Sequence, residues 1–212
     1  GSDVILPSSG VTNEAGETTV TLTSTTKAVS DITVSARTGS TAAVNADRTV
    51  SFTADTTSAT VDTVSLVGPE VHKVADGKNT FTYAVTVKDA GGNVLPGVAV
   101  TPASDKAGVT LTTAGLTDAA GQTTVTLTST TKAVSDITVS ARAGSTAAVN
   151  ADRTVSFTYD ISTAQVGTVT LNDDTQSKIA DGSSAFTYTA QVVDANGNPV
   201  TEAGVTVNWS QD

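Results

Sequence analysis

Cysteine and methionine are both absent from this chain of 212 residues, and aromatic residues make up only 4% of it. Without cysteine, a disulfide scaffold and a cysteine-based zinc site are excluded. The single histidine, His72, has no motif around it that would supply a nucleophile and an orienting carboxylate. We therefore expect no catalytic residue and no enzyme, and we interpret His72 as an exposed loop residue. No apolar run approaches the 18 residues of a membrane-spanning helix.

Basic residues are scarce as well, with 11 Lys and Arg against 21 Asp and Glu and a formal net charge of -10. Nucleic-acid backbones and anionic lipid surfaces repel such a chain, so we expect no nucleic-acid partner and no direct membrane contact. The chain opens with Gly1-Ser2 rather than Met. We expect it to be part of a longer protein, with Gly1-Ser2 either native or a cloning remnant.

A long internal repeat is the most informative feature that is present. Residues 18–53 recur as residues 123–158, 105 positions later, with one change, Thr38 to Ala143. Weaker matches continue on both sides, and a two-residue insertion then aligns Gly97 with Gly204. A fixed period of this size indicates a tandem array of small domains.

Apolar residues alternate with polar ones along most of the chain. Phe81, Tyr83, Val85 and Val87 alternate with polar or small residues, and the same period of two recurs in residues 123–128, 137–142 and 154–159. This period and the abundance of Thr and Val are typical of strands with one buried face. About seven short strands per unit, separated by Gly- and Asn-rich turns, predict all-β, antiparallel β-sandwiches arranged in tandem.

Polar segments at residues 55–60 and 160–165 precede the first strand of each unit, so we place the domain boundaries there. Residues 1–59 are then the C-terminal half of one repeat, residues 60–163 a complete repeat, and residues 164–212 the N-terminal half of the next. Because these joints are only a few residues long, we expect an elongated array with limited bending.

The order of these short motifs resembles the bacterial immunoglobulin-like domain of the intimin/invasin family of adhesins. The residues that carry the resemblance are Ala75-Asp76-Gly77, Asp89 to Asn93, Gly97 to Val100, Thr117 to Gly121 and, in the last unit, Val205 to Ser210. The resemblance implies an immunoglobulin-like fold and a stalk that carries a distal tip away from the bacterial surface. It implies an extracellular location, anchoring through other parts of the parent protein, and neighbouring repeats of the same chain as partners.

Trp209 and Pro102 occupy the same position of the repeat and lead to different expectations. Trp209 follows Val205 and Val207 in alternation, so we expect it to be buried with them. Pro102 occupies the corresponding position of the complete unit, where its missing N–H predicts a short strand or a sheet edge.

Acidic residues near the boundaries are the candidates for a metal site. No Asp-x-Asp-x-Asp-Gly loop is present, and most of the Asp residues stand in turn motifs. We therefore expect no cofactor and no dedicated metal site. Asp55, Asp62 and Asp160 stay weak candidates for calcium between domains.

The phase of the repeat adds a further expectation. Gly1 corresponds to Lys106 and Asp212 to Asp105, so the two half-repeats sum to one complete domain. Open half-sandwiches expose an apolar face and unpaired strand edges, so we expect head-to-tail self-association between chains. A continuous longer stalk, cut at this phase, is the alternative.

Three functions remain open from the sequence. The first is a structural stalk module of a bacterial cell-surface adhesin. The second is a binding module that contacts a host receptor or a like molecule in cell–cell adhesion. An enzyme would need a unique cleft with paired carboxylates, and the near-identity of the two repeats disfavours this.

Overall fold

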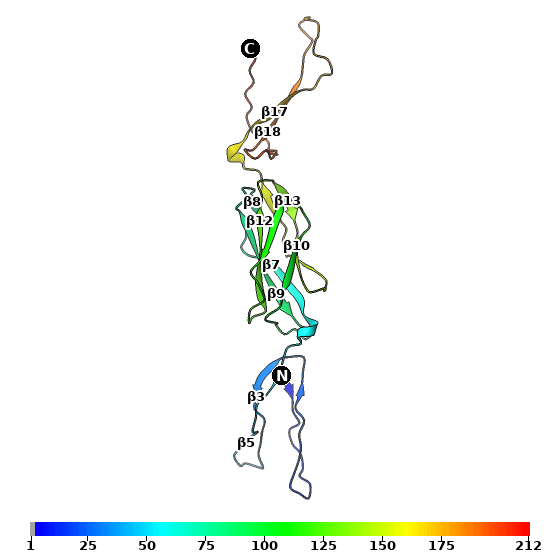
Figure 1. Ribbon diagram of the computed structural model, residues 1–212, viewed down its shortest axis with the longest axis vertical. Helices are drawn as coiled ribbons and strands as arrows, with labels where there is room; N and C mark the ends of the chain where they lie inside the picture. Colours follow the sequence, from blue (N-terminus) through cyan, green and yellow to red (C-terminus); the bar gives the residue numbers. More distant parts are fainter. Residues whose placement is uncertain (1–2) are drawn as a thin grey trace.

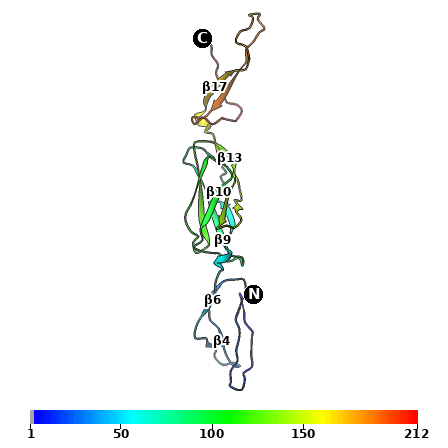
Figure 2. The same ribbon diagram turned by 45° about the vertical axis from the view of Figure 1, so that its right-hand side comes forward.

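The computed structural model describes residues 3–212; Gly1 and Ser2 lie outside the described residues. Three parts follow one another along a single long axis (Figure 1). We call them the N-terminal arm (residues 3–54), the middle domain (residues 60–158) and the C-terminal arm (residues 165–212). Figure 2 shows the two arms again at opposite ends of the middle domain. This elongated, almost entirely β arrangement confirms the fold class predicted from the sequence.

The first sheet of the middle domain consists of β7 (Thr60–Leu66), β9 (Thr80–Lys88), β11 (Val109–Thr113) and β12 (Gln122–Ser129). Its order is β11–β12–β9–β7, with all neighbours antiparallel. This order pairs strands far apart in the sequence, as in the first sheet of immunoglobulin-like sandwiches.

The second layer consists of β8 (His72–Val74), β10 (Val100–Ser104), β13 (Val134–Ile137), β14 (Val139–Ala143), β15 (Val149–Asn150) and β16 (Val155–Thr158). Its ladders are ordered β10–β14–β15 and β13–β16–β8. The β13–β16 register shifts around Asp136, whose φ is 53°. The Ser156 hydroxyl accepts a hydrogen bond from the Asp136 N–H at 2.9 Å and supports this irregularity.

Side chains from the two layers meet in one core. The alternating residues of β9 are all buried, from Phe81 to Val87, as are Val125 and Leu127 of β12. The Phe81 ring lies 5.1 Å from the Phe157 ring of the second layer, centroid to centroid. The strand alternation predicted from the sequence is confirmed for this domain.

One strand pair departs from the antiparallel pattern, since β8 runs parallel to β16. After β7 the chain turns at Gly68, with φ +85°, and Pro69, and then crosses from the first sheet to the second. Glycine tolerates this positive φ, and proline ends the ladder. His72 opens β8 and is exposed, as predicted, but its predicted position in a loop is wrong.

Pro102 lies in the middle of β10, opposite Ala141 of β14. Strand β10 stands at the end of its ladder and pairs only with β14 among the described strands. Proline is tolerated there because an edge strand needs only one set of ladder hydrogen bonds. The predicted sheet edge is confirmed.

The N-terminal arm holds only short ladders. Its strands are β1 (Val4–Ile5), β2 (Thr23–Ser24), β3 (Val29–Ile32), β4 (Ser35–Ala36), β5 (Val44–Asn45) and β6 (Val50–Phe52). They pair as β1–β2, β3–β6 and β4–β5. Residues 18–22 form no strand, although the identical residues 123–127 belong to β12. The partner that β12 has in β9 is missing beside this segment.

The C-terminal arm contains one hairpin of β17 (Gln165–Leu171) and β18 (Tyr188–Val193). Residues 205–212 lie outside any strand, and the Trp209 side chain is 58% exposed, so its predicted burial is wrong. The reason is the absence of a facing layer: the equivalent segment β10 pairs with β14, whose counterpart, residues 34–38, is at the other end of the molecule.

Helical structure in residues 3–212 amounts to two 3₁₀ turns, η1 (Thr56–Ser58) and η2 (Ile161–Thr163). Within this range no helix has the length and apolar character needed to cross a membrane.

Candidate functional site at the two joints

Each joint of the molecule begins with a capped 3₁₀ turn. At the first joint, between the N-terminal arm and the middle domain, the Asp55 carboxylate accepts hydrogen bonds from the Thr57 N–H at 2.9 Å and the Thr57 hydroxyl at 2.6 Å. Asp160 does the same for Ser162 at the second joint. Aspartate favours this position because its short side chain bonds the backbone two residues on. The Thr57 hydroxyl in particular lowers the pKa of Asp55.

Asn93 connects the middle domain to the N-terminal arm. It ends the turn after β9, and its side-chain amide donates to the Thr26 carbonyl at 2.8 Å and accepts from the Ala28 N–H at 2.8 Å. Both amide atoms are thus used on one short loop of the arm. This geometry fixes the position and the orientation of that loop.

Asp89 holds Asn93 in place and makes a contact of its own across the joint. Its carboxylate accepts from the Asn93 N–H at 2.8 Å and from the Asn93 amide group at 3.0 Å. The same carboxylate accepts from the Asp55 N–H at 2.9 Å. Hydrogen bonds from Asn93 and then from Asp55 lower the pKa of Asp89 to about 2. Asp89 is therefore charged at neutral pH although its side chain is buried.

The second joint, between the middle domain and the C-terminal arm, repeats this arrangement. Asn198 donates to the Thr131 carbonyl and accepts from the Ala133 N–H, each at 2.8 Å. Asp194 accepts from the Asp160 N–H at 3.0 Å. Burial alone would raise the pKa of Asp194, but hydrogen bonds from Asn198 and the Asp160 N–H outweigh it and lower the pKa. We call each Asp–Asn pair, Asp89 with Asn93 and Asp194 with Asn198, a clasp.

The two joints differ in detail. The Tyr159 hydroxyl donates to Glu202 at 2.7 Å across the second joint, whereas Ala54 stands in the equivalent position at the first. At the first joint an added Cβ on Gly91 would lie 2.5 Å from the Thr26 carbonyl oxygen, whereas Asn196 stands in the equivalent position at the second joint. The repeated element is therefore the clasp rather than every contact around it.

Mechanically, each clasp fixes its joint at two separate points. One is the connecting segment, through the Asp55 or Asp160 N–H, and the other is a loop that lies nearly 30 residues earlier in the chain. A single point of attachment would allow rotation in any direction, whereas two points leave rotation only about the line that joins them. Charge-assisted bonds to the carboxylate strengthen this restriction.

The acidic residues named as weak calcium candidates are not brought together. Asp55 and Asp160 cap turns at opposite ends of the middle domain, and Asp62 on β7 forms an ion pair with Lys88 at 2.8 Å. In residues 3–212 no group of three or more potential metal-binding side chains is present. Calcium at the joints stays a prediction from sequence.

Sequence reasoning missed the clasps themselves. It interpreted Asp89–Asn93 and Asp194–Asn198 as turns, and the Gly92 and Gly197 N–H groups do donate to the Asp carbonyl of each turn, at 3.1 and 3.0 Å. The available signal was the recurrence of both turns at the same distance from a joint. The packing of two domains decides which backbone groups Asn93 and Asn198 reach. A local sequence pattern does not predict this packing.

Part of this chain matches a known protein family, and several solved structures are similar to it. Residues 63–158 match the family of bacterial Ig-like domains, group 1. The Escherichia coli adhesin FdeC has a similar fold, with a TM-score of 0.52 and 21% identity over 94% of this chain and 64% of that chain. The D00-D0 domain of intimin is 29% identical with a TM-score of 0.40, and the match covers 47% of each chain. Yersinia pseudotuberculosis InvD is 17% identical with a TM-score of 0.47, and the match covers 93% of this chain and 61% of that chain.

This chain spans less than two thirds of the length of each of these structures. The family match covers the segment that forms the closed two-layer core. It also agrees with the family predicted from the short motifs. The middle domain of this chain is thus similar to the group 1 family of bacterial Ig-like domains.

Proposed function

We propose that this chain is a stalk module of a bacterial cell-surface adhesin, which holds a distal tip at a fixed distance from the cell. The observation that carries the proposal is the recurrence of the same clasp at both joints. A stalk needs its successive domains held in line, whereas a binding site needs a distinctive surface only once. The similar fold of FdeC, an Escherichia coli adhesin, supports the same role.

In this proposal the repeat units are residues 1–59, 60–163 and 164–212, and neighbouring repeats of one parent protein are the principal partners. The module is extracellular, and other parts of the parent anchor it. The Thr-rich, polar outer faces and the net charge of -10 suit an exposed spacer that must avoid sticking to its surroundings.

The proposal can be tested by placing the 212-residue chain between a membrane anchor and a small binding tip on a bacterial surface. The target of the tip is presented beneath polymer brushes of increasing height. We expect the chain to support binding through taller brushes than a Gly/Ser linker of equal length, because such a linker coils on itself. Asn93→Ala with Asn198→Ala should lose part of this advantage, and Asn196→Ala should not, because Asn196 contributes to its turn through the backbone N–H.

Two results would contradict the stalk role. One is equal performance of the chain and the flexible linker. The other is binding of the chain without its tip to host cells or to bacteria that display the same chain, which would favour a binding module.

A further inference from the structure

Asn196 is followed by Gly197, and this is the one Asn-Gly pair in the sequence. In such a pair the backbone nitrogen of the glycine can attack the side-chain amide of the asparagine, because glycine has no Cβ that hinders the approach. The asparagine then loses its amide group. The pair stands inside the turn of the second clasp, between Asp194 and Asn198.

The Asn196 side chain is accessible. It is exposed and makes no hydrogen bond among the described residues, while the Asn196 backbone N–H donates to the Asp194 carboxylate at 2.9 Å. Gly197 is exposed as well, with a φ of +81° and no atom within 4 Å of an added Cβ. Water therefore reaches both residues of the pair.

The equivalent turn is also open in the middle domain, where both layers of the sandwich are present. That turn is Asp89 to Asn93. Gly92, the equivalent of Gly197, is exposed and has no atom within 4 Å of an added Cβ. The strands that complete a sandwich therefore leave this turn accessible.

A hydrogen bond restrains the attacking nitrogen. The Gly197 N–H donates to the Asp194 carbonyl at 3.0 Å, so this nitrogen is occupied while the turn is closed. Attack on the Asn196 side chain requires this bond to break. The Asn198 amide group, which donates to the Asp194 carboxylate at 3.0 Å, helps to keep the turn closed. The clasp therefore slows the reaction.

We propose that Asn196 is a site of spontaneous deamidation and that the isoaspartate formed there loosens the second joint. The Gly197 nitrogen forms a bond to the side-chain carbonyl carbon of Asn196, and the amide nitrogen leaves as ammonia with the proton that the Gly197 nitrogen gives up. Water then opens the resulting succinimide ring at either carbonyl, which yields aspartate or isoaspartate. The inference goes beyond the stalk role, since neither step requires a parent adhesin.

Isoaspartate changes the spacing of donors within the clasp. One carboxylate oxygen of Asp194 accepts from the Asn196 N–H and from the Asn198 N–H, each at 2.9 Å. Isoaspartate routes the backbone through the former side chain and so adds one carbon atom between these two donors. The present geometry of both bonds is then lost. The new carboxylate also places a negative charge close to Asp194, whose lowered pKa keeps it ionised at neutral pH.

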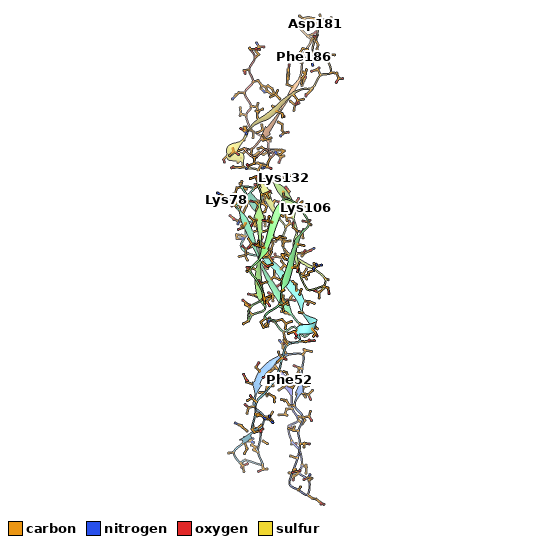
Figure 3. The ribbon with its side chains drawn as sticks, in the orientation of Figure 1. Phe52, Lys78, Lys106, Lys132, Asp181 and Phe186 are labelled. Carbon is orange, nitrogen blue, oxygen red and sulfur yellow. The ribbon has the colours of Figure 1, made fainter. Side chains whose placement is uncertain are left out.

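Asn198 transmits this change to the middle domain. It binds the Thr131 carbonyl and the Ala133 N–H, each at 2.8 Å. Figure 3 labels Lys132, which stands between these two residues, at the end of the middle domain that faces the C-terminal arm. Displacement of Asn198 weakens both bonds and lets the second joint bend. The first joint does not change in this way, because Gly91 has no side-chain amide.

Peptide mass spectrometry tests the reaction, with a methyltransferase specific for isoaspartate as the label. The chain is kept in mildly alkaline buffer. We expect product at Asn196 about 10-fold faster than at Asn45, which is exposed but is followed by Ala46. An Asn196 that stays intact while a free peptide of residues 191–201 reacts would overturn the proposal.

Asn198→Ala tests whether the clasp restrains the reaction. This variant removes the amide group that holds the Asp194 carboxylate, so deamidation at Asn196 should be faster than in the unmodified chain. An unchanged rate would show that the closed turn offers no protection and would overturn this part of the proposal.

Amide NMR signals measure the effect on the joint. After the alkaline treatment, the Ala133 amide should show a second signal whose intensity equals the isoaspartate fraction. The Ala28 amide, which has the same role at the first joint, should stay unchanged. The matched control is Asn196→Gly, which copies Gly91 and should keep a single Ala133 signal throughout.

Freshly prepared Asn196→Asp separates the charge from the backbone length. It adds a carboxylate without the extra backbone carbon, so it should displace the Ala133 signal less than isoaspartate does. Equal displacement in both would overturn the role of backbone length. Isoaspartate at position 196 with an unmoved Ala133 signal would overturn the loosening of the joint.

Discussion

One polar group in the core of the middle domain is unfavourable for stability. The Tyr83 hydroxyl is buried without a hydrogen-bond partner among the described residues. Burial, and to a lesser extent the negative charge of Asp152, raises the pKa of Tyr83 to about 12. A buried polar group without a partner costs about 1–3 kcal/mol of desolvation. Tyr83 is therefore a position where the sequence is not optimal for stability.

We predict that Tyr83→Phe raises the free energy of unfolding by about 1 kcal/mol, because it removes that penalty and keeps the ring. The matched control is Tyr188→Phe, which alters the exposed equivalent and should leave stability unchanged. Chemical denaturation of both variants measures the difference. A loss of stability in Tyr83→Phe would mean that the hydroxyl has a partner after all.

The same residue predicts a pH effect on stability. The unfolded chain ionises at about pH 10, the ordinary value, and the folded chain near 12. The stability due to neutral Tyr83 is thus complete below pH 10 and is lost as the pH rises toward 12. Between pH 10 and pH 12, the free energy of unfolding of Tyr83→Phe should therefore fall less with pH than that of the unmodified chain.

At the scale of elements, the sequence predicted strands well where a partner strand is present. The alternation in residues 123–128 correctly predicts a buried Val125 and Leu127 in β12. The identical residues 18–23 form a strand only at Thr23. Alternation specifies which face is apolar, but a ladder also requires a neighbouring strand, which no local pattern supplies.

The joints show a second limit of prediction. The polar segments at residues 55–60 and 160–165 were recognised, but not their 3₁₀ turns or the clasps that fasten them. A turn is specified by a few adjacent residues, whereas a clasp depends on loops about 65 residues apart in the sequence. The parallel pair β8–β16 was missed for the same reason.

Acid should open the first joint. Hydrogen bonds from Asn93 and Asp55 depress the pKa of Asp89 to about 2. Because the pKa of Asp89 is lower in the folded chain than in the unfolded chain, ionised Asp89 stabilises the fold. This stabilisation is present above about pH 4 and is lost as the pH falls through 2. Carboxyl-carbon NMR should give a midpoint for Asp89 well below 3.8, and the Ala28 amide signal should shift over the same range.

An Asp89→Asn variant serves as the control for this titration. Its Ala28 amide should show the shifted position already at neutral pH and change little on acidification. A midpoint near 3.8 for Asp89 in the unmodified chain would contradict the hydrogen-bonding pattern of the clasp.

At the scale of the whole molecule, the period of 105 residues becomes a mechanical repeat. Each period supplies one sandwich and one clasped joint. The joint sets the orientation of each domain relative to the next. The tandem, extended arrangement was predictable from the repeat and the short joints. We infer that its straightness depends on the clasps.

Small-angle X-ray scattering of the dilute chain, at a concentration where it is monomeric, tests this most directly. We predict a single extended particle whose maximum dimension matches the length of the structure in Figure 1. Asn93→Ala with Asn198→Ala should shorten the mean dimension and broaden its distribution, while Asn196→Ala should leave the curve unchanged. A bent, variable ensemble for the unmodified chain, or superimposable curves for the chain and the double variant, would contradict the claim that the clasps hold the domains in line.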